Sequence, residues 1–354
     1  MSELKTKKPS KLDALKAMSP KDRNRAIVDT LMNNAMFIII AIAVVGIAIA
    51  RRRFLSPASI INIINLTAAK LPIALGVGGC IILAGTDISA GRQVGLAACI
   101  AAGLQLTTNK LFPGLAVMPI WVALLAVLAV GAVIGFVNGF CMAKFKLHPF
   151  IVTLSTQLIV YGLVLMFLQL GTNSGQTLSG MSKEYRDFVV GELFVVDGTV
   201  VPMYVLYSVI IAFVVWVIWN KTTFGKNMYA VGSNEDAANV SGVNVSKTII
   251  MVFMMAGMLY ALTGFFDAAR IASVNATTGL NYEADAIAAC VIGGISFVGG
   301  IGKVSGAVIG VLLLQLIFVG LNFLSVDQNL LYIVKGLIIL VACAIDMRKY
   351  LVRK

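Results

Sequence analysis

Charged residues are scarce in this chain. Asp, Glu, Lys and Arg make up 12% of the 354 residues, whereas 59% are apolar and the mean hydropathy is +0.93. A soluble domain carries about twice that share of charge. The apolar residues also fall in runs long enough to cross a bilayer. This pattern excludes an ordinary soluble domain and predicts an all-α polytopic membrane protein.

The motifs of common active sites are also missing. The chain has one histidine, His148, and five cysteines without a Cys-x-x-Cys spacing, so we expect no metal site. It contains no Gly-x-x-x-x-Gly-Lys-Ser/Thr loop for ATP, no Gly-x-Ser-x-Gly and no His-Glu-x-x-His. Its net charge of +12 is not accompanied by a basic face interleaved with aromatics. We therefore expect neither an enzyme, nor a cofactor in this chain, nor a nucleic-acid partner.

Apolar runs predict ten membrane segments in a transmembrane domain of residues 31–346. The positive-inside rule favours a cytoplasmic basic tail (residues 1–30), a cytoplasmic polar stretch (221–248) and a cytoplasmic C-terminal tail (347–354). The cluster Arg51–Arg53 then lies outside, against that rule. We expect the second segment to be interrupted by Lys70 and Pro72. The segments are 31–50, 58–84, 92–108, 115–142, 150–170, 203–220, 248–269, 284–298, 303–324 and 329–346.

One five-residue sequence occurs twice. Gly-Ala-Val-Ile-Gly stands at 131–135 and again at 306–310, in the fourth and ninth predicted segments. Because five segments separate the two copies, two five-helix halves would run in opposite directions, as in an inverted repeat. Glycines spaced four residues apart also let helix backbones approach closely. Close packing is therefore the default interpretation, and a 5+5 inverted repeat is the alternative.

The polar stretch 221–248 contains a short predicted helix. Ser233 is positioned to cap its start, with Asp236 completing a Ser-x-x-Asp box, and Gly242 is the expected stop. Glu235 and Asp236 fall in the first turn, where the helix dipole favours negative charge. A helix of about two turns is not stable alone in water. It is either part of a solvated loop or docks on headgroups, on this chain or in a partner's groove, and we favour the partner.

Polar residues between the second and third segments mark a candidate gate. Thr86, Asp87 and Ser89 stand at a predicted membrane boundary. A helix broken there must line a cavity or be buried in protein, so that its backbone polar groups are satisfied. Asp87 is also positioned to cap the third helix, so a tight capped turn is the alternative. A second polar turn, with His148 and Thr153, is predicted on the same side.

Acidic side chains on the predicted outer side are candidate contacts for a soluble partner. Two lie in the loop 171–202, which is long enough to present a surface but equally suits a plain solvated loop. Two lie at the outer end of the eighth segment, where carboxylates are either functional or simply interfacial. Nearby, Asp267 and Arg270 are spaced to pair on one helix face. The four candidates are Glu184, Asp187, Glu283 and Asp285.

Four motifs along the chain form a recognisable set. They are GTDISAGRQVG at 85–95, HPFIVTLSTQ at 148–157, FGKNMYAVGSNEDAANVSGVNV at 224–245 and NYEADAIAACVIGGISFVGGIG at 281–302. Together they resemble permease subunits of ATP-binding-cassette (ABC) sugar importers of the ribose and galactoside type. The first motif is most similar to the galactose and methyl-galactoside branch. The resemblance covers about residues 31–350 and implies a type II importer fold.

The resemblance also implies partners and roles. It implies a permease of the bacterial inner membrane, surrounded by lipid, with two copies of this chain, a cytoplasmic ATPase that binds ATP and Mg²⁺, and a sugar-binding protein outside. The helix at Glu235–Gly242, with Ala237 and Ala238, would be the coupling helix seated in the ATPase. The turns Thr86–Ser89 and His148–Thr153 would lie at gates. The alternative is a secondary sugar transporter that uses Asp87 or Asp285 for ion coupling and needs no ATPase.

Overall fold

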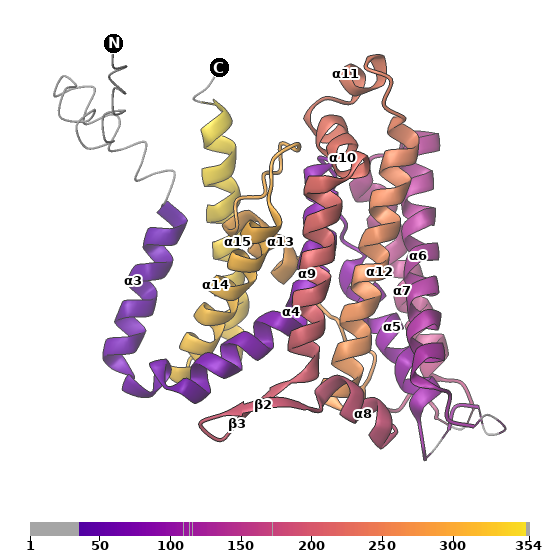
Figure 1. The fold of residues 1–354 in the computed structure, drawn as a ribbon, viewed down its shortest axis with the longest axis vertical. Helices are drawn as coiled ribbons and strands as arrows, with labels where there is room; N and C mark the ends of the chain where they lie inside the picture. The colour runs from indigo at the N-terminus through magenta and orange to yellow at the C-terminus, as the bar shows by residue number, and fades with distance from the viewer. Residues whose placement is uncertain (1–34, 109, 113, 115, 172, 352–354) are drawn as a thin grey trace, which may run out of the picture.

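The computed structural model describes residues 35–351, except 109, 113, 115 and 172 (Figure 1). The described residues form 13 α-helices, not the ten predicted, although one of them lies in each predicted segment. Among the described residues six helices are long and apolar enough to cross a membrane: α4, α6, α7, α9, α12 and α14. The predicted tail 1–30 lies outside the described residues. The ten helices are α3 (Ala35–Ala50), α4 (Pro57–Ile82), α5 (Ala90–Gln105), α6 (Ile120–Phe145), α7 (Pro149–Leu168), α9 (Met203–Lys221), α12 (Val245–Ile271), α13 (Tyr282–Ile292), α14 (Val304–Phe323) and α15 (Gln328–Leu351).

The predicted interruption of the second segment is wrong. Helix α4 is continuous over 26 residues and contains both Lys70 and Pro72. Ser56 caps its start by accepting a hydrogen bond from the Ser59 N–H, and Pro57 occupies the first position. A proline inside a membrane helix is tolerated where neighbouring helices cover the freed backbone groups. All residues from Leu71 to Ile82 are buried, which meets that condition.

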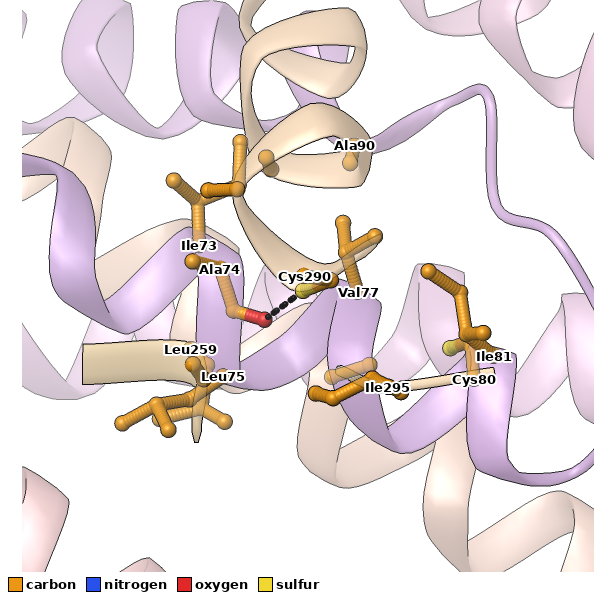
Figure 2. Close-up of a cluster of buried hydrophobic side chains, with 14 of the residues drawn as sticks. Ile73, Ala74, Leu75, Val77, Cys80, Ile81, Ala90, Leu259, Cys290 and Ile295 are labelled. Atoms are coloured by element: carbon orange, nitrogen blue, oxygen red, sulfur yellow. Dashed lines mark hydrogen bonds between the residues drawn. The ribbon is translucent and has the colours of Figure 1, made fainter. Parts of the chain in front are cut away.

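Two short helices, α5 and α13, follow breaks in the chain and pack in the centre. Helix α5 begins after the turn 83–89, and α13 begins after the loop 272–281. The long helices α4 and α12 contact each other, α12 also packs on α5 and α6, and α4 packs on α13 and α14. Figure 2 shows α13 against α4, with the Cys290 thiol donating to the Ala74 carbonyl oxygen at 3.1 Å. The main core therefore forms where the broken helices meet the long ones.

Glycines bring the central helices together. A side chain at Gly131 or Gly135 of α6 would overlap the backbone of α12, at Gly257 and Phe253 respectively. The second copy of the repeated sequence does the same against a different helix, because Gly306 and Gly310 of α14 lie against the backbone of α13. The packing interpretation of both copies is confirmed.

The polar stretch 221–248 projects at one end of the bundle. It forms two helices, α10 (Thr223–Ser233) and α11 (Glu235–Val240), beyond the ends of the long helices (Figure 1). The first residues of α3 and the last of α15 lie at this same end (Figure 1). The start of the described chain, its end and the polar stretch thus lie at one end of the bundle.

The opposite end carries short strands, so the fold is mainly but not entirely helical. The loop 171–202, for which a partner surface and a plain solvated loop were both open, forms α8 (Lys183–Val190) and an antiparallel hairpin of β2 (Glu192–Val196) and β3 (Thr199–Pro202) (Figure 1). Strand β1 (Leu178–Ser179) pairs with β4 (Ser273–Val274), which ties this loop to the segment after α12. The exposed cluster Arg51–Arg53 reaches into a 3-10 helix, η1 (Arg52–Leu55), between α3 and α4.

Candidate coupling surface and gate

Helix α11 exists, but the residue that caps it differs from the prediction. Ser233 is the last residue of α10, and its hydroxyl donates to the Tyr229 carbonyl oxygen at 2.8 Å. The cap is Asn234, whose extended backbone separates the two helices and whose Oδ1 accepts from the Ala237 N–H at 2.8 Å. The predicted Ser-x-x-Asp box is therefore wrong. Asparagine and serine cap helices about equally well, so residue type alone could not show whether Ser233 or Asn234 is the cap.

Gly242 ends α11 as predicted. It has a positive φ of +84°, a conformation that glycine adopts without strain. Its N–H donates to the Asn239 carbonyl oxygen at 3.0 Å, and the Val243 N–H donates to that of Ala238, also at 3.0 Å. This is the Schellman pattern of helix ends. Two residues later Asn244 caps α12 through the Lys247 N–H, so the stretch is a rigid helix–turn–helix rather than a loose loop.

One face of α11 points away from the rest of the chain. Its outward side chains include both first-turn carboxylates and Val240, which is 90% exposed. Ala238 is buried against Val231 of α10 and Val245 of α12, so this predicted contact residue seats α11 on the chain instead. Val240 is the most exposed of the large apolar side chains among the described residues. The outward residues are Glu235, Asp236, Ala237, Asn239 and Val240.

An ion pair joins α11 to the end of α6. Lys146 Nζ lies 2.6 Å from Glu235 Oε1, with both side chains about half exposed or more. Exposed pairs contribute little to stability, but this one forms one wall of a cleft of about 480 Å³ that extends to Asp236 and Asn244. We name the outward face of α11 and this cleft the coupling surface.

Helix α10 connects the coupling surface to the candidate gate. Gly232 packs so closely on the end of α4 that a side chain there would overlap the Ile82 carbonyl oxygen and the Gly300 amide. The Gly300 N–H donates to that same Ile82 oxygen at 2.8 Å, and the Tyr229 hydroxyl donates to the Gly302 oxygen at 3.0 Å. Helix α10 therefore contacts both the end of α4, just before the turn 83–89, and the loop 293–303.

The gate residues meet in a buried polar network. Ser89 is its centre: its hydroxyl donates to Asp87 Oδ1 at 2.5 Å and accepts from Gln93 at 2.9 Å and from Asn138 at 3.2 Å. The Thr156 hydroxyl donates to Asn138 Oδ1 at 2.6 Å. Asp87, Ser89 and Asn138 are fully buried. These bonds join α5, α6 and α7, while Asp87 Oδ2 and Gln93 Oε1 are buried without a hydrogen-bond partner among the described residues.

Asp87 does not cap α5. Its Oδ1 also accepts from the Ser89 N–H at 2.9 Å, which makes an Asx turn just before the helix, and no side chain caps the first turn of α5. The structure does bring the two predicted gate turns together, because the Thr153 hydroxyl is 3.3 Å from the Thr86 carbonyl oxygen. His148 is exposed and caps α7 by accepting from the Phe150 N–H. Beside it, a cleft of about 410 Å³ reaches from Gly85 to Glu235.

The four acidic candidates do not form one surface. Glu184 and Asp187 are exposed on α8 at the end opposite the coupling surface. Glu283 is buried, with its carboxylate against Gly91 of α5, and Asp285 is half-buried and paired with Lys335. Burial removes Glu283 from any exposed docking surface. The Asp267–Arg270 pair is confirmed at 2.8 Å.

Residues that the sequence reasoning missed lie on neighbouring helices. Gln93, Asn138 and Thr156 complete the network around Ser89, Val240 lies on the coupling surface, and Asn234 caps its helix. A lone amide in an apolar helix, such as Asn138 in α6, was an available signal, since polar groups at membrane depth need a partner. Which partner it would find depends on how α5, α6 and α7 pack.

The comparisons with known proteins cover almost the whole chain. Residues 59–343 match the family described as branched-chain amino acid transport system / permease component. A galactose/methyl galactoside import permease of Haemophilus influenzae is 43% identical over 95% of this chain and 100% of its own length. The Escherichia coli K12 protein of that name is 42% identical over 93% and 98%.

More distant relatives carry a different sugar in their names. A ribose import permease of Bacillus subtilis is 35% identical over 88% of this chain and 92% of its own length. No solved structure matches this chain. The resemblance drawn from the four motifs is confirmed, and the packed membrane helices agree with it. The chain belongs to this family of permease components of import systems.

Proposed function

We propose that this chain is the transmembrane subunit of an ATP-driven importer that carries galactose or methyl galactosides across the bacterial inner membrane. The observation that carries the proposal is the 43% identity, over 95% of the chain, to an import permease named for those sugars. The exposed, rigidly capped helix α11 supports it, because a membrane subunit without its own ATP site needs a contact for an ATPase.

In this proposal the coupling surface seats in a groove of the ATPase. Val240 fills the groove, and the first-turn carboxylates Glu235 and Asp236 meet donors at its rim. Closure of the ATPase on ATP moves α11 together with α10, since Ala238 packs between them. The close contact at Gly232 then shifts the end of α4 and the turn that follows. The helices rearrange between inward- and outward-facing states without any covalent chemistry in this chain.

The gate is the point where the turn 83–89 meets the start of α7. Thr86, Asp87 and Ser89 stand on one side, and His148 and Thr153 on the other. The cleft beside His148 is the cytoplasmic exit of the sugar path. Breaking the contact between Thr153 and the Thr86 backbone opens the exit, while the network around Ser89 holds it closed between cycles.

The proposal also includes ten membrane crossings, arranged in two inverted halves. Each half has a long helix, a break and a short helix: α4 and α5 in the first, α12 and α13 in the second. If the halves correspond, α4 is the counterpart of α12, α5 of α13 and α6 of α14. The packing of α4 on α13 and α14 then matches the packing of α12 on α5 and α6. Both termini and the coupling surface then lie in the cytoplasm. Glu184 and Asp187 of α8 face a soluble sugar-binding protein outside, and a second copy of the chain completes the sugar path.

The test is co-purification of the tagged chain from native membranes with its neighbours identified. We expect an ATPase to co-purify, and to be lost with Ala237→Arg and with Val240→Asp, because both place charge on the coupling surface. Val195→Asp is the matched control, since Val195 is 45% exposed on β2 at the opposite end. If the chain purifies alone and moves sugar under an ion gradient, it is a secondary transporter and the coupling assignment is wrong.

A further inference from the structure

A cluster of ionisable side chains lies where α4, α12, α13 and α15 meet. Charged groups taken out of water are costly and need partners. The coupling surface and the gate use none of these residues. They come from four helices that are far apart in the chain. The ion cluster consists of Lys70 of α4, Asp267 and Arg270 of α12, Tyr282 and Asp285 of α13, and Lys335 of α15.

One carboxylate of the cluster is held firmly within its own helix. Asp267 is fully buried, and its Oδ1 accepts from Arg270 Nε at 2.9 Å and from Nη2 at 2.8 Å. Charge-assisted bonds in this paired geometry are strong. Because both residues belong to α12, the pair fixes the side chains without linking α12 to a neighbouring helix.

Lys70 is held poorly by comparison. Its Nζ lies 3.8 Å from Asp267 Oδ2 and over the ring of Tyr282, 2.6 Å from the ring centre. Within the described part of the chain this nitrogen has no hydrogen-bond partner, although an ammonium has three donors. A buried ammonium without a hydrogen bond is costly, so a closer carboxylate would lower the free energy of Lys70.

The candidate for that carboxylate is Asp285, one turn along α13 from Tyr282. Lys70, Tyr282 and Asp285 line the same small void. In this conformation Asp285 forms an ion pair with Lys335. The Lys335 Nζ lies 2.9 Å from Asp285 Oδ1 and 3.1 Å from Asp285 Oδ2. Three cations of the cluster therefore compete for two carboxylates. Helix α13 has only 11 residues, so its position depends on such contacts more than that of a full span does.

We propose that the ion cluster is a two-position latch on α13. The Lys335–Asp285 pair holds α13 against α15 in the conformation seen here, and Lys70 becomes the partner of Asp285 when α13 moves during transport. Lys70 and Lys335 are thus positioning residues for the conformational cycle. The inference rests on the proposed transport function, but it concerns a part of the molecule that neither the ATPase nor the gate contacts.

The first test breaks the latch in the reconstituted complex with its ATPase and binding protein. With Lys335→Met we expect the rate of sugar uptake to fall about tenfold. A change of that size is within the range of interaction energies measured for residues in direct contact. ATP hydrolysis in the absence of binding protein should rise, because α13 is no longer held. Lys70→Met should lower uptake alone, since the pair seen here remains intact. Unchanged uptake and hydrolysis in both variants would overturn the proposal.

The second test exchanges the charges, with Asp285→Lys and Lys335→Asp combined. This double variant rebuilds the pair with α15, so hydrolysis without binding protein should return to the unmodified level. Uptake should stay low, because Lys70 then faces a lysine at position 285 and the second position is lost. A static ion pair predicts recovery of both readouts, and that result would contradict the latch.

A third measurement uses the unmodified complex, in case a variant does not assemble. Backbone hydrogen exchange in α13 should increase while ATP and sugar are being consumed, relative to the resting complex, whereas the buried part of α12 should stay protected. Equal protection of α13 in the two states would count against any movement. If the unmodified complex takes up no sugar with ATP, the proposed function fails first, independently of the latch.

Discussion

At the scale of single residues, one serine hydroxyl is the centre of the polar network at the proposed gate. Ser89 uses its hydroxyl as a donor to Asp87 and as an acceptor for two amides, from Gln93 and Asn138. Every side chain in this set is buried, so none can turn to water if a partner is removed. If one partner is removed, the remaining polar group stays buried without a hydrogen bond. The free-energy cost is therefore the desolvation of that group in addition to the lost hydrogen bond.

Removal of the Asp87 carboxylate tests this network. In Asp87→Ala the N–H and the hydroxyl of Ser89 lose their common acceptor, at about 1–3 kcal/mol for the closed gate. We expect the complex to assemble in normal amounts but to take up sugar more slowly or to leak it. Asp87→Asn keeps an acceptor oxygen and should retain most of the uptake. Normal transport by Asp87→Ala would reduce Asp87 to a local turn residue.

At the scale of elements, α10 lies between the coupling surface and the proposed gate and contacts both α11 and the end of α4. Its last turn fits under the end of α4 because Gly232 has no side chain, and Tyr229 reaches the loop after α13. Helix α11, with six residues, is too short to transmit force except through what it packs on. The seating of Ala238 against α10 and α12 provides that contact.

A methyl group at Gly232 should disturb this connection. The added carbon of Gly232→Ala overlaps the Ile82 carbonyl oxygen, so α10 must move off α4. We expect the sugar transported per ATP hydrolysed to fall, while the ATPase still binds. Gly162→Ala is the control, because a side chain at this position in α7 meets nothing within 4 Å. Equal coupling ratios in the two variants would show that α10 is not the connection.

At the scale of the whole molecule, the two ends differ in character. One end carries the coupling surface and both ends of the described chain, and the other carries α8, the β2–β3 hairpin and Arg51–Arg53 (Figure 1). The positive-inside rule weighs the whole chain, so one basic turn on the outer side does not reverse it. The Lys and Arg distribution therefore favours the first end as cytoplasmic.

Labelling of single introduced cysteines in intact cells tests this orientation. Asp197 is exposed at the hairpin turn and Ser241 is exposed at the end of α11. A membrane-impermeant thiol reagent should modify Asp197→Cys from outside, and should modify Ser241→Cys only after the membrane is opened. The native cysteines Cys80, Cys99 and Cys290 are buried and Cys141 and Cys343 are half-buried, so background is low. The reverse labelling pattern would invert the topology.

The sequence by itself determined the helical membrane class of the protein, the packing glycines and the end of α11. These features are local or additive. Apolar runs indicate burial in lipid or protein. Gly242 indicates a positive φ, a backbone conformation that few other residues adopt. The family also followed from the sequence, because four ordered motifs span most of the chain.

Only the tertiary structure decided which polar groups meet. Glu283 and Glu235 are alike in the sequence, yet one is buried against α5 and the other is exposed on α11. Ala237 and Ala238 are neighbours of the same type, but α10 and α12 cover only the second. The partners within the ion cluster come from four separate helices. Such contacts depend on the rotation and depth of each helix, which are set by packing against its neighbours and which no local pattern encodes.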